Sequence, residues 1–498
     1  MAAMNLKIIS NSVSSDRVDW PRLFQPSYHH NLVSNPSFCG RKVLHNDRKL
    51  LLHPTSGRRN RLRGICVSAS NRFSESQTHS FDVVIIGAGI IGLYIAREVL
   101  LRSNLSVAVV DAGVPGAATG AGQGYIWRIN KTPGNEKWKL AARSHKLWEN
   151  LAVSMQEQGM DPSEVLGWKK TGSLLVGKTE EECSLLWSRA QQLRDAGLAV
   201  ELLSSEDLLL KEPALVLGKE AGAAFLPDDY QLDARVTIEF IKKVNMNFAA
   251  EGRYAEFYHE PATSLVRSSS NGEVEAIETC KSTICSKKAV IVAAGCWSGS
   301  LMHNLIRESD IELDIPIEPR KGHLLVIENF KSFKLNHALM EVGYVNHQSA
   351  TRSAAPNHGS IYDAQVTSIS MTATMDTSGK SLILGSSRQL VGFNTVIDES
   401  IVNRIWERAA EFFPALRKMS LEDMKKSRSI RVGLRPYMPD GKPMVGPVPG
   451  CSNLFVAAGH EGEGLTLAPG TAEMIADMVL GNPRKVDPAP FAVQWCEV

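Results

Sequence analysis

The sequence predicts an α/β fold that begins with a dinucleotide-binding βαβ unit. An apolar, β-branched run at 81–86 is typical of a buried parallel strand, and the motif GAGIIG follows it directly at 87–92. A helical segment, LYIAREVLLR, comes next, and a second apolar strand at 106–110 ends at Asp111. A strand, a glycine motif, a helix and a second strand that ends in an acid together form the full context of a dinucleotide fingerprint.

Each glycine of this motif has its own task. Gly87 allows the tight turn, Gly89 lets the backbone approach a pyrophosphate, and Gly92 lets helix and strand pack closely. The N-terminus of the helix then faces the phosphates, while Asp111 accepts hydrogen bonds from ribose hydroxyls. An acid at this position disfavours NADP. Because the chain has no second GxGxxG and no CxxC, a disulfide reductase with two dinucleotides is excluded, and FAD and NAD stay open.

Composition and charge argue against several other classes of protein. The 498 residues are 43% hydrophobic and 22% charged, enough for two or three domains with sizeable cores. The longest uncharged apolar run, 83–96, is too short to span a bilayer. Residues 1–74 hold 12 Lys and Arg against three acids, a local charge of +9. Because the net charge of the whole chain is +2, the remaining residues carry −7. An acidic body argues against nucleic-acid binding, and no His, Cys or Asp cluster has metal-ligand spacing.

The basic N-terminal segment, residues 1–74, is predicted to be a transit peptide and no part of the fold. It is rich in Ser, Asn, His and Arg, is poor in acids, and lacks a sustained period. Its stretch RGICVSA at 63–69 is similar to a plastid processing site, which predicts the chloroplast. The dense arginines at 58–63 leave the mitochondrion as the alternative, and a disordered tail without an address is a third reading.

Three segments far apart in the chain are predicted to close one site. A loop of small residues at 117–124 lets a ring system lie against the backbone. An apolar strand at 289–293 ends in a glycine turn, and a turn-rich run at 434–446 precedes the strand 453–459. The loop HEGEG at 460–464 then leads into a helix at about 468–480.

These motifs resemble the D-amino-acid oxidase/glycine oxidase family of FAD-dependent oxidoreductases, as a plant, organelle-targeted member. The matches are GAGIIG with Asp111, VAAGCWS, GLRPYMPDGKPMVG and NLFVAAGHEGEGLTLAPGTAEMIADMV. The resemblance implies a Rossmann-type FAD-binding domain with a mixed, largely parallel sheet, and an α+β substrate domain with a large antiparallel sheet. It divides the chain into an FAD-binding domain at 80–150, 229–300 and 426–498, and a substrate domain at 151–228 and 301–425.

The resemblance also implies the reaction. A hydride would pass from the C–N carbon of a small amino acid or secondary amine acid to flavin N5, giving an imine that hydrolyses, and oxygen or another acceptor would then take the electrons. Two other classes stay open: an FAD-dependent 2-hydroxy-acid dehydrogenase, which would share the carboxylate site, and a non-catalytic flavoprotein assembly factor.

Three residues are the catalytic candidates, the first two of them by family match. Arg435 would hold the substrate carboxylate with its planar fork of donors, although an arginine bracing the turn before Pro436 is the structural alternative. Tyr344 would contact substrate, or be a buried sheet tyrosine. His460 would take a proton from the substrate ammonium. Its neighbours Glu461 and Glu463 are expected to lie on a solvated loop face.

The resemblance assigns FAD contacts to residues in each of the motif segments. They are Gly87, Gly89, Ile91, Gly92, Asp111, Ala112, Thr119, Gly120, Gln123, Gly124, Ala294, Gly295, Trp297, Gly459, Glu461, Gly462, Gly464, Leu465 and Thr466. Some relatives attach FAD through a Cys or a His, and at those positions this chain has Gly433 and Gln123. The FAD is therefore expected to be non-covalent.

The predicted substrate domain has fewer signals of its own. A strand is expected at 174–177, and helices with apolar stripes at 184–196 and 400–413. Arg388 ends an apolar strand and either steers substrate or pairs with a surface acid. The polar stretch 346–372 is expected to be a loop insertion over the site.

Overall fold

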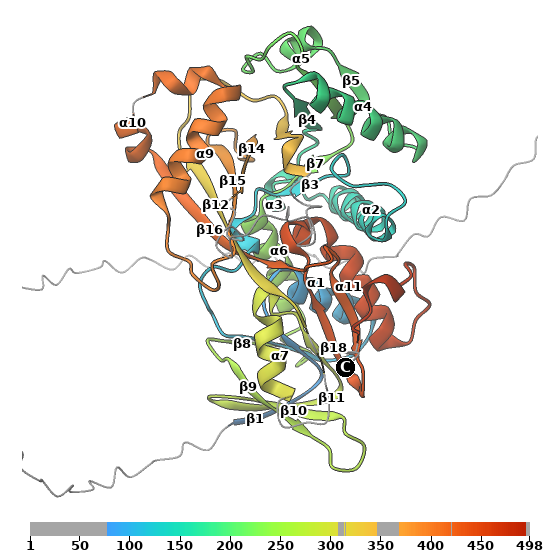
Figure 1. Cartoon of the computed structure of the whole chain (residues 1–498). Coiled ribbons are helices and arrows are strands. Elements are labelled where there is room, and N and C mark those ends of the chain that lie inside the picture. The colour runs from blue at the N-terminus through green and yellow to red at the C-terminus, as the bar shows by residue number, and fades with distance from the viewer. Residues whose placement is uncertain (1–76, 307–312, 314, 346–367, 420, 495–498) are drawn as a thin grey trace, which may run out of the picture. The chain divides into compact units, whose positions relative to one another are not determined.

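The fold is described from a computed structural model in which the following residues are placed: 77–306, 313, 315–345, 368–419 and 421–494. The predicted leader, 1–74, and most of the predicted insertion, 346–367, lie outside these described residues. The described residues belong to one compact unit. Element labels follow Figure 1.

The predicted βαβ unit lies at the centre of the first sheet, which is mixed. β1 pairs in parallel with β2 on one side and β11 on the other, and β2–β8 and β11–β18 are also parallel, while β17 and the β9–β10 extension pair antiparallel. The strand order, with bounds, is β17 (Met444–Val448), β18 (Cys451–Ala458), β11 (Ser282–Val292), β1 (Gln77–Ile86), β2 (Val107–Asp111) and β8 (Tyr254–Tyr258); β10 (Val274–Thr279) pairs with β11 and β9 (Ala262–Arg267).

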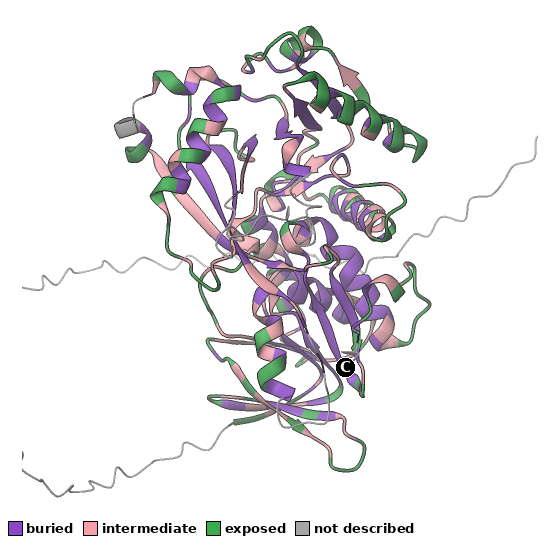
Figure 2. Cartoon of the chain, viewed as in Figure 1, coloured by how far each residue is buried: buried purple, intermediate pink, exposed green. Residues whose placement is uncertain are grey.

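Both faces of this sheet are covered, which explains why β1 has no polar alternation at its buried end. Val84 and Ile86 pack in a core with Met302 of helix α7 (Ser298–Ile306). On the other face, a Cβ at Gly92 of helix α1 (Ile90–Arg102) would lie 3.2 Å from Ile85 Cγ2. Figure 2 shows the central strands of this sheet and helix α1 as mostly buried, while β8 and β9 are mostly intermediate or exposed.

The second sheet is almost wholly antiparallel, with one parallel pair, β13–β4. Helix α9 (Glu399–Phe412) covers one face, where its Ile405 and Trp406 join the core (Figure 1). The strand order is β16 (Arg428–Tyr437), β12 (Glu318–Ile327), β15 (Leu382–Arg388), β14 (Ser368–Met375), β13 (Ala338–Glu341), β4 (Ser173–Gly177), β6 (Gly222–Leu226) and β5 (Glu201–Leu203); β3 (Tyr125–Ile126) and β7 (Tyr230–Gln231) form a separate pair.

Several of the helices begin at a side-chain cap. Asp233 accepts hydrogen bonds from the first amides of α6, and Asp398 does so for α9. The other helices are α2 (Glu136–Glu157), α3 (Pro162–Val165), α4 (Glu180–Asp195), α5 (Ser205–Lys211), α6 (Ala234–Met246), α10 (Leu421–Lys426) and α11 (Gly464–Leu480). Among the described residues, none of these helices combines the length and apolar composition needed to cross a membrane.

The predicted fold class is confirmed, and two details differ. Residues 368–372, expected in a loop insertion, begin strand β14, because Met371, Ala373 and the sheet around them form a buried core. Strand β16 falls in the predicted 426–498 segment of the FAD-binding domain, yet it pairs with β12 of the second sheet. The division into domains otherwise stays a prediction.

Candidate active site

A cavity of about 390 Å³ lies where the parallel strands of the first sheet end. Its wall includes Ile86, Val110 and Ala458, at or near the carboxyl ends of three of those strands. The opposite wall comes from the second sheet, at Leu324 of β12, Ser386 of β15 and residues 433–436 of β16. A crevice at the carboxyl edge of a parallel sheet is where α/β folds bind nucleotides.

The glycine motif forms a turn that no larger residue would fit. Gly87 has a φ of 117°, and a Cβ there would come within 2.7 Å of the carbonyl carbon of Ala293 and closer still to its oxygen. A Cβ at Gly92 would overlap the carbonyl oxygen of Gly87. Asp111 steadies this turn, because its Oδ2 accepts a hydrogen bond from Ala88 N at 2.8 Å. Helix α1 therefore begins at the cavity with its amides toward it.

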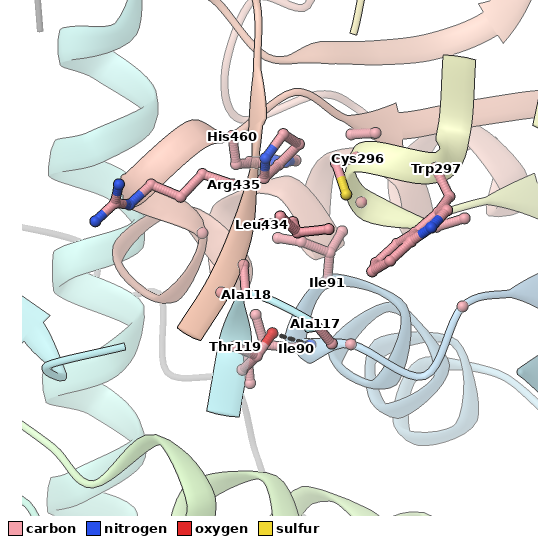
Figure 3. Close-up of a pocket in the computed structure, with 18 of the residues that line it drawn as sticks. Ile90, Ile91, Ala117, Ala118, Thr119, Cys296, Trp297, Leu434, Arg435 and His460 are labelled. Carbon is pink, nitrogen blue, oxygen red and sulfur yellow. Dashed lines mark hydrogen bonds between the residues drawn. The ribbon is translucent and has the colours of Figure 1, made fainter. Parts of the chain in front are cut away.

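The loop 117–124 joins the two sheets around the cavity. Thr119 Oγ1 accepts a hydrogen bond from Ile90 N at 3.3 Å, which Figure 3 shows as a dashed line. Gln123 Oε1 accepts a hydrogen bond from Thr372 Oγ1 of β14 at 2.8 Å. On the same side, Leu434 N of β16 donates to Gly116 O at 2.8 Å. The small residues predicted here are thus held in place by contacts on both sides.

The loop 460–464 is held by buried ion pairs, so the prediction that its glutamates lie on a solvated face is wrong. Glu463 pairs with Lys131 and, at 2.8 Å, with Lys137. Burial alone would raise the pKa of this carboxyl, but the two lysines hold it down at about 2. Glu461 pairs with Arg320, whose Nε donates to Glu461 Oε1 at 2.9 Å. These contacts fix the start of α11 beside the cavity.

His460 is buried, and its imidazole is engaged. Its Nε2 lies 3.0 Å from Thr471 Oγ1 of α11. Burial lowers the pKa of His460 to about 4, with Lys137 adding to the effect, so the ring is neutral at pH 7. His460 lines the cavity, as Figure 3 shows, but a base with this pKa is weak toward a substrate ammonium.

Arg435 lies on β16, directly opposite Arg320 on β12, so both side chains share one face of the sheet. Its Nη1 donates to Ser387 O at 2.9 Å. A Cβ at Gly322 would lie 2.5 Å from Arg435 Nη2. Among the residues that the structure places, no carboxylate lies within 4.0 Å of the Arg435 guanidinium.

Tyr344 completes this side of the cavity, and Arg388 lies against it. Tyr344 is buried and lines the cavity, and a Cβ at Gly462 would lie 3.7 Å from its hydroxyl and 3.8 Å from Arg435 Nε. The guanidinium of Arg388 stacks over the Tyr344 ring, 4.0 Å from its centroid. Arg388 is 4% exposed, so it is no surface residue, and no described acid pairs with it.

The structure brings the predicted residues together at this one cavity, except for three glycines and one threonine. Arg435, Tyr344 and His460 line it, and so do the predicted cofactor residues except Gly92, Gly120, Gly459 and Thr466. Gly92 serves helix packing, and Thr466 Oγ1 donates to Tyr125 O at 2.9 Å. The sequence analysis missed Arg320, Gly322 and Ser386. Only the pairing of β12 with its neighbouring strands reveals these residues, and no motif marks them.

Comparisons with known proteins agree with this geometry. A sequence model of the family "FAD dependent oxidoreductase" (DAO) matches residues 82–478. A glycine oxidase of Geobacillus kaustophilus is 27% identical over 419 residues, which cover 84% of this chain and 97% of the relative. A glycine oxidase of Pseudomonas aeruginosa is 27% identical over 420 residues, which cover 82% and 98%. The crystal structure of glycine oxidase from Geobacillus kaustophilus superimposes with a TM-score of 0.66 at 24% identity, covering 84% of this chain and 99% of that one.

Proposed function

Because the chain belongs to the family of FAD-dependent oxidoreductases that matches residues 82–478, we propose that its described cavity holds FAD and that Arg435 binds the substrate carboxylate beside it. The chain is an FAD-dependent oxidoreductase of amino acids or amines. The roles of the individual residues are the proposal.

The residues present fit a dinucleotide that lies extended through the cavity. The cradle is open where Gly87, Gly89 and Gly433 have no side chains, and a Cβ at Gly433 would come within 2.8 Å of Ala121 Cβ. Asp111 would hold the ribose end, and the first amides of α1 would face the pyrophosphate. At the other end the loop 460–464 and the start of α11 would border the isoalloxazine. Bound FAD supplies the hydride acceptor for the C–N carbon, and the protein supplies position and charge.

One observation supports Arg435 most strongly: it lines the cavity, and among the described residues its guanidinium makes one hydrogen bond, to a neutral carbonyl. A half-buried cation without a described carboxylate partner favours an anionic ligand, because desolvating an unpaired charge is costly. A planar guanidinium can hold a carboxylate through two parallel hydrogen bonds. Tyr344, whose hydroxyl lies beside Arg435, would donate to the same carboxylate.

The charge around the cavity also bears on the substrate amine. Arg435, Arg388 and Arg320 surround the single carboxylate of Glu461, and they hold its pKa at about 2 even though burial would raise it. A positive site of this kind repels an ammonium group. We therefore propose that the substrate reacts as the free amine, with the proton lost to solvent before binding and His460 contributing shape rather than proton transfer.

The test is anaerobic reduction of the bound flavin by a panel of small amino acids, secondary amine acids and 2-hydroxy acids, with Arg435→Met and Arg435→Lys beside the wild type. Loss of a charge-assisted pair predicts a fall of about 10- to 150-fold in the second-order rate of reduction in Arg435→Met, with Arg435→Lys between the two. Equal rates in all three proteins would contradict the carboxylate role. Reduction by 2-hydroxy acids alone would contradict the amine chemistry.

We also propose that residues 1–74 direct the chain to the chloroplast. The support is the excess of 12 Lys and Arg over three acids and the RGICVSA stretch at 63–69. A fluorescent fusion of the first 74 residues should accumulate in chloroplasts, and the mature N-terminus should lie near residue 69. Accumulation in mitochondria, or an uncleaved chain in the cytosol, would overturn the proposal.

A further inference from the structure

Arg388 is a buried cation. The carboxylate-binding role proposed for Arg435 gives the charge of Arg388 no partner. Arg388 is 4% exposed and makes two long hydrogen bonds, Nη1 to Ser368 Oγ at 3.4 Å and Nη2 to Tyr344 O at 3.5 Å. Its Nε has no hydrogen-bond partner among the described residues. Removing a guanidinium from water without a compensating anion costs several kcal/mol, so such a group is retained where a ligand completes it.

The position of Arg388 connects it to the cavity. Arg388 and Ser386 are two residues apart on β15, so their side chains point to the same face of the sheet. Ser386 lines the cavity, is 2% exposed, and its Oγ has no partner among the residues described. Tyr344 links the two arginines, because its ring lies under the Arg388 guanidinium, and its hydroxyl and Arg435 Nε both lie within 4 Å of where a Cβ at Gly462 would stand.

The charges of this cluster do not balance. Arg320 and Glu461 form an ion pair and neutralise each other. Arg388 and Arg435 remain, each without a carboxylate within 4.0 Å in the described part of the chain. Arg435 lines the cavity, and Arg388 lies against Tyr344, which lines it. The carboxylate of a simple amino acid such as glycine would neutralise one of them. The second requires another anionic group on the same ligand.

Resting on the function proposed above, we infer that Arg388, with Ser386, binds a second carboxylate of the substrate, so that the preferred substrates are amino acids or secondary amine acids with two carboxylates. Arg435 holds the carboxylate next to the reacting carbon, and Arg388 holds the distal one. The ring of Tyr344 separates the two binding positions and sets the spacing between them.

The test measures binding of unreactive carboxylates to the FAD-loaded enzyme through the change in flavin absorbance. The probes are malonate, succinate and glutarate, each compared with the monocarboxylate of equal chain length: propionate, butyrate and valerate. The variants are Arg388→Met, Arg388→Lys and, as the matched control, Arg404→Met, which removes the same charge at an exposed site on α9. All Kd values are taken at one ionic strength, because exposed charges are screened by salt.

In the wild type, the best-fitting dicarboxylate should bind about 10- to 100-fold more tightly than its monocarboxylate partner. Arg388→Met should abolish this ratio while leaving the monocarboxylate Kd unchanged, Arg388→Lys should keep part of it, and Arg404→Met should keep all of it. A merely structural role of Arg388 would weaken both classes equally and would overturn the inference.

Failure of this inference can be told from failure of the proposed function. If neutral amino acids reduce the flavin and monocarboxylates bind as well as dicarboxylates, the second carboxylate site is wrong while the amino-acid chemistry stands. If no amino acid reduces the flavin and no carboxylate perturbs its spectrum, the role of Arg435 is wrong as well.

Discussion

The Arg435 side chain occupies the space beside Gly322 that a side chain at position 322 would fill, and the two residues lie on neighbouring antiparallel strands. The Arg435 guanidinium lies where a Cβ at Gly322 would stand, 2.5 Å from Nη2 and 2.6 Å from Cζ. The glycine on β12 therefore fixes where the guanidinium on β16 can rest. Because the guanidinium is the far end of a flexible side chain, it can move away from an added methyl group without disturbing the sheet.

This relationship predicts that Gly322→Ala impairs substrate binding without unfolding the protein. The added methyl group should displace the Arg435 guanidinium and lower kcat/KM by roughly 10- to 100-fold, because misplacement of a positioning group by about 1 Å is costly. Thermal unfolding and FAD content should match the wild type. Gly218→Ala, at an exposed glycine whose Cβ would meet only Glu220 Oε2 at 3.4 Å, is the control. An unchanged kcat/KM in Gly322→Ala would show that the guanidinium is free to rest elsewhere.

Replacing Gly87 should weaken FAD binding by more than its positive φ alone predicts. Gly87→Ala combines a φ of 117° with a clash against the Ala293 backbone, so the turn beneath the pyrophosphate must open. We expect purified Gly87→Ala to be colourless and to take up little FAD in a titration. Gly252→Ala is the matched control, because Gly252 has a φ of 71° and nothing within 4 Å of its Cβ. It should lose about 1–2 kcal/mol of stability and stay yellow.

Local pattern was enough to predict the nucleotide half of the site. Gly92 is explained by contacts within the βαβ unit itself, and Asp111 ends the strand that pairs with β1 and accepts a hydrogen bond from Ala88 N. Such features lie within some 25 residues of one another and have a fixed spacing, so a single sequence can reveal them. The antiparallel sheet was predicted through the family resemblance instead.

The charged part of the site could not be predicted in this way. Glu463 meets Lys131 from a segment more than 300 residues earlier, and Glu461, in the turn after β18, meets Arg320 of β12, which is 141 residues earlier. A glutamate in a glycine-rich loop has no local signal that separates a buried ion pair from a solvated face. The burial of Arg388 likewise follows from the position of β15 inside the second sheet, which the apolar strand alone did not reveal.

The flavin should be released when the protein is denatured. Gly433 offers no nucleophile where some relatives have a cysteine, and Cys296, which lines the cavity, is a buried thiol whose pKa is raised to about 12 by burial. Acid precipitation should therefore leave all FAD in the supernatant, measured by its absorbance. Flavin fluorescence that stays with the denatured chain would contradict this, and its loss in Cys296→Ser would identify the attachment site.

The buried imidazole of His460 should make stability fall as the pH is lowered from 6.5 toward 4. Burial lowers its pKa from 6.5 to about 4, so in this window the unfolded chain binds a proton that the folded chain does not. Stability is therefore fully present above about pH 6.5 and declines as the pH falls. For this residue the linkage gives a loss of roughly 2 kcal/mol between pH 7 and pH 5. Urea unfolding at both pH values measures the free energy of unfolding. Its decline from pH 7 to pH 5 should be smaller by this amount in His460→Gln than in the wild type. Equal declines would show that His460 is protonated in the folded protein.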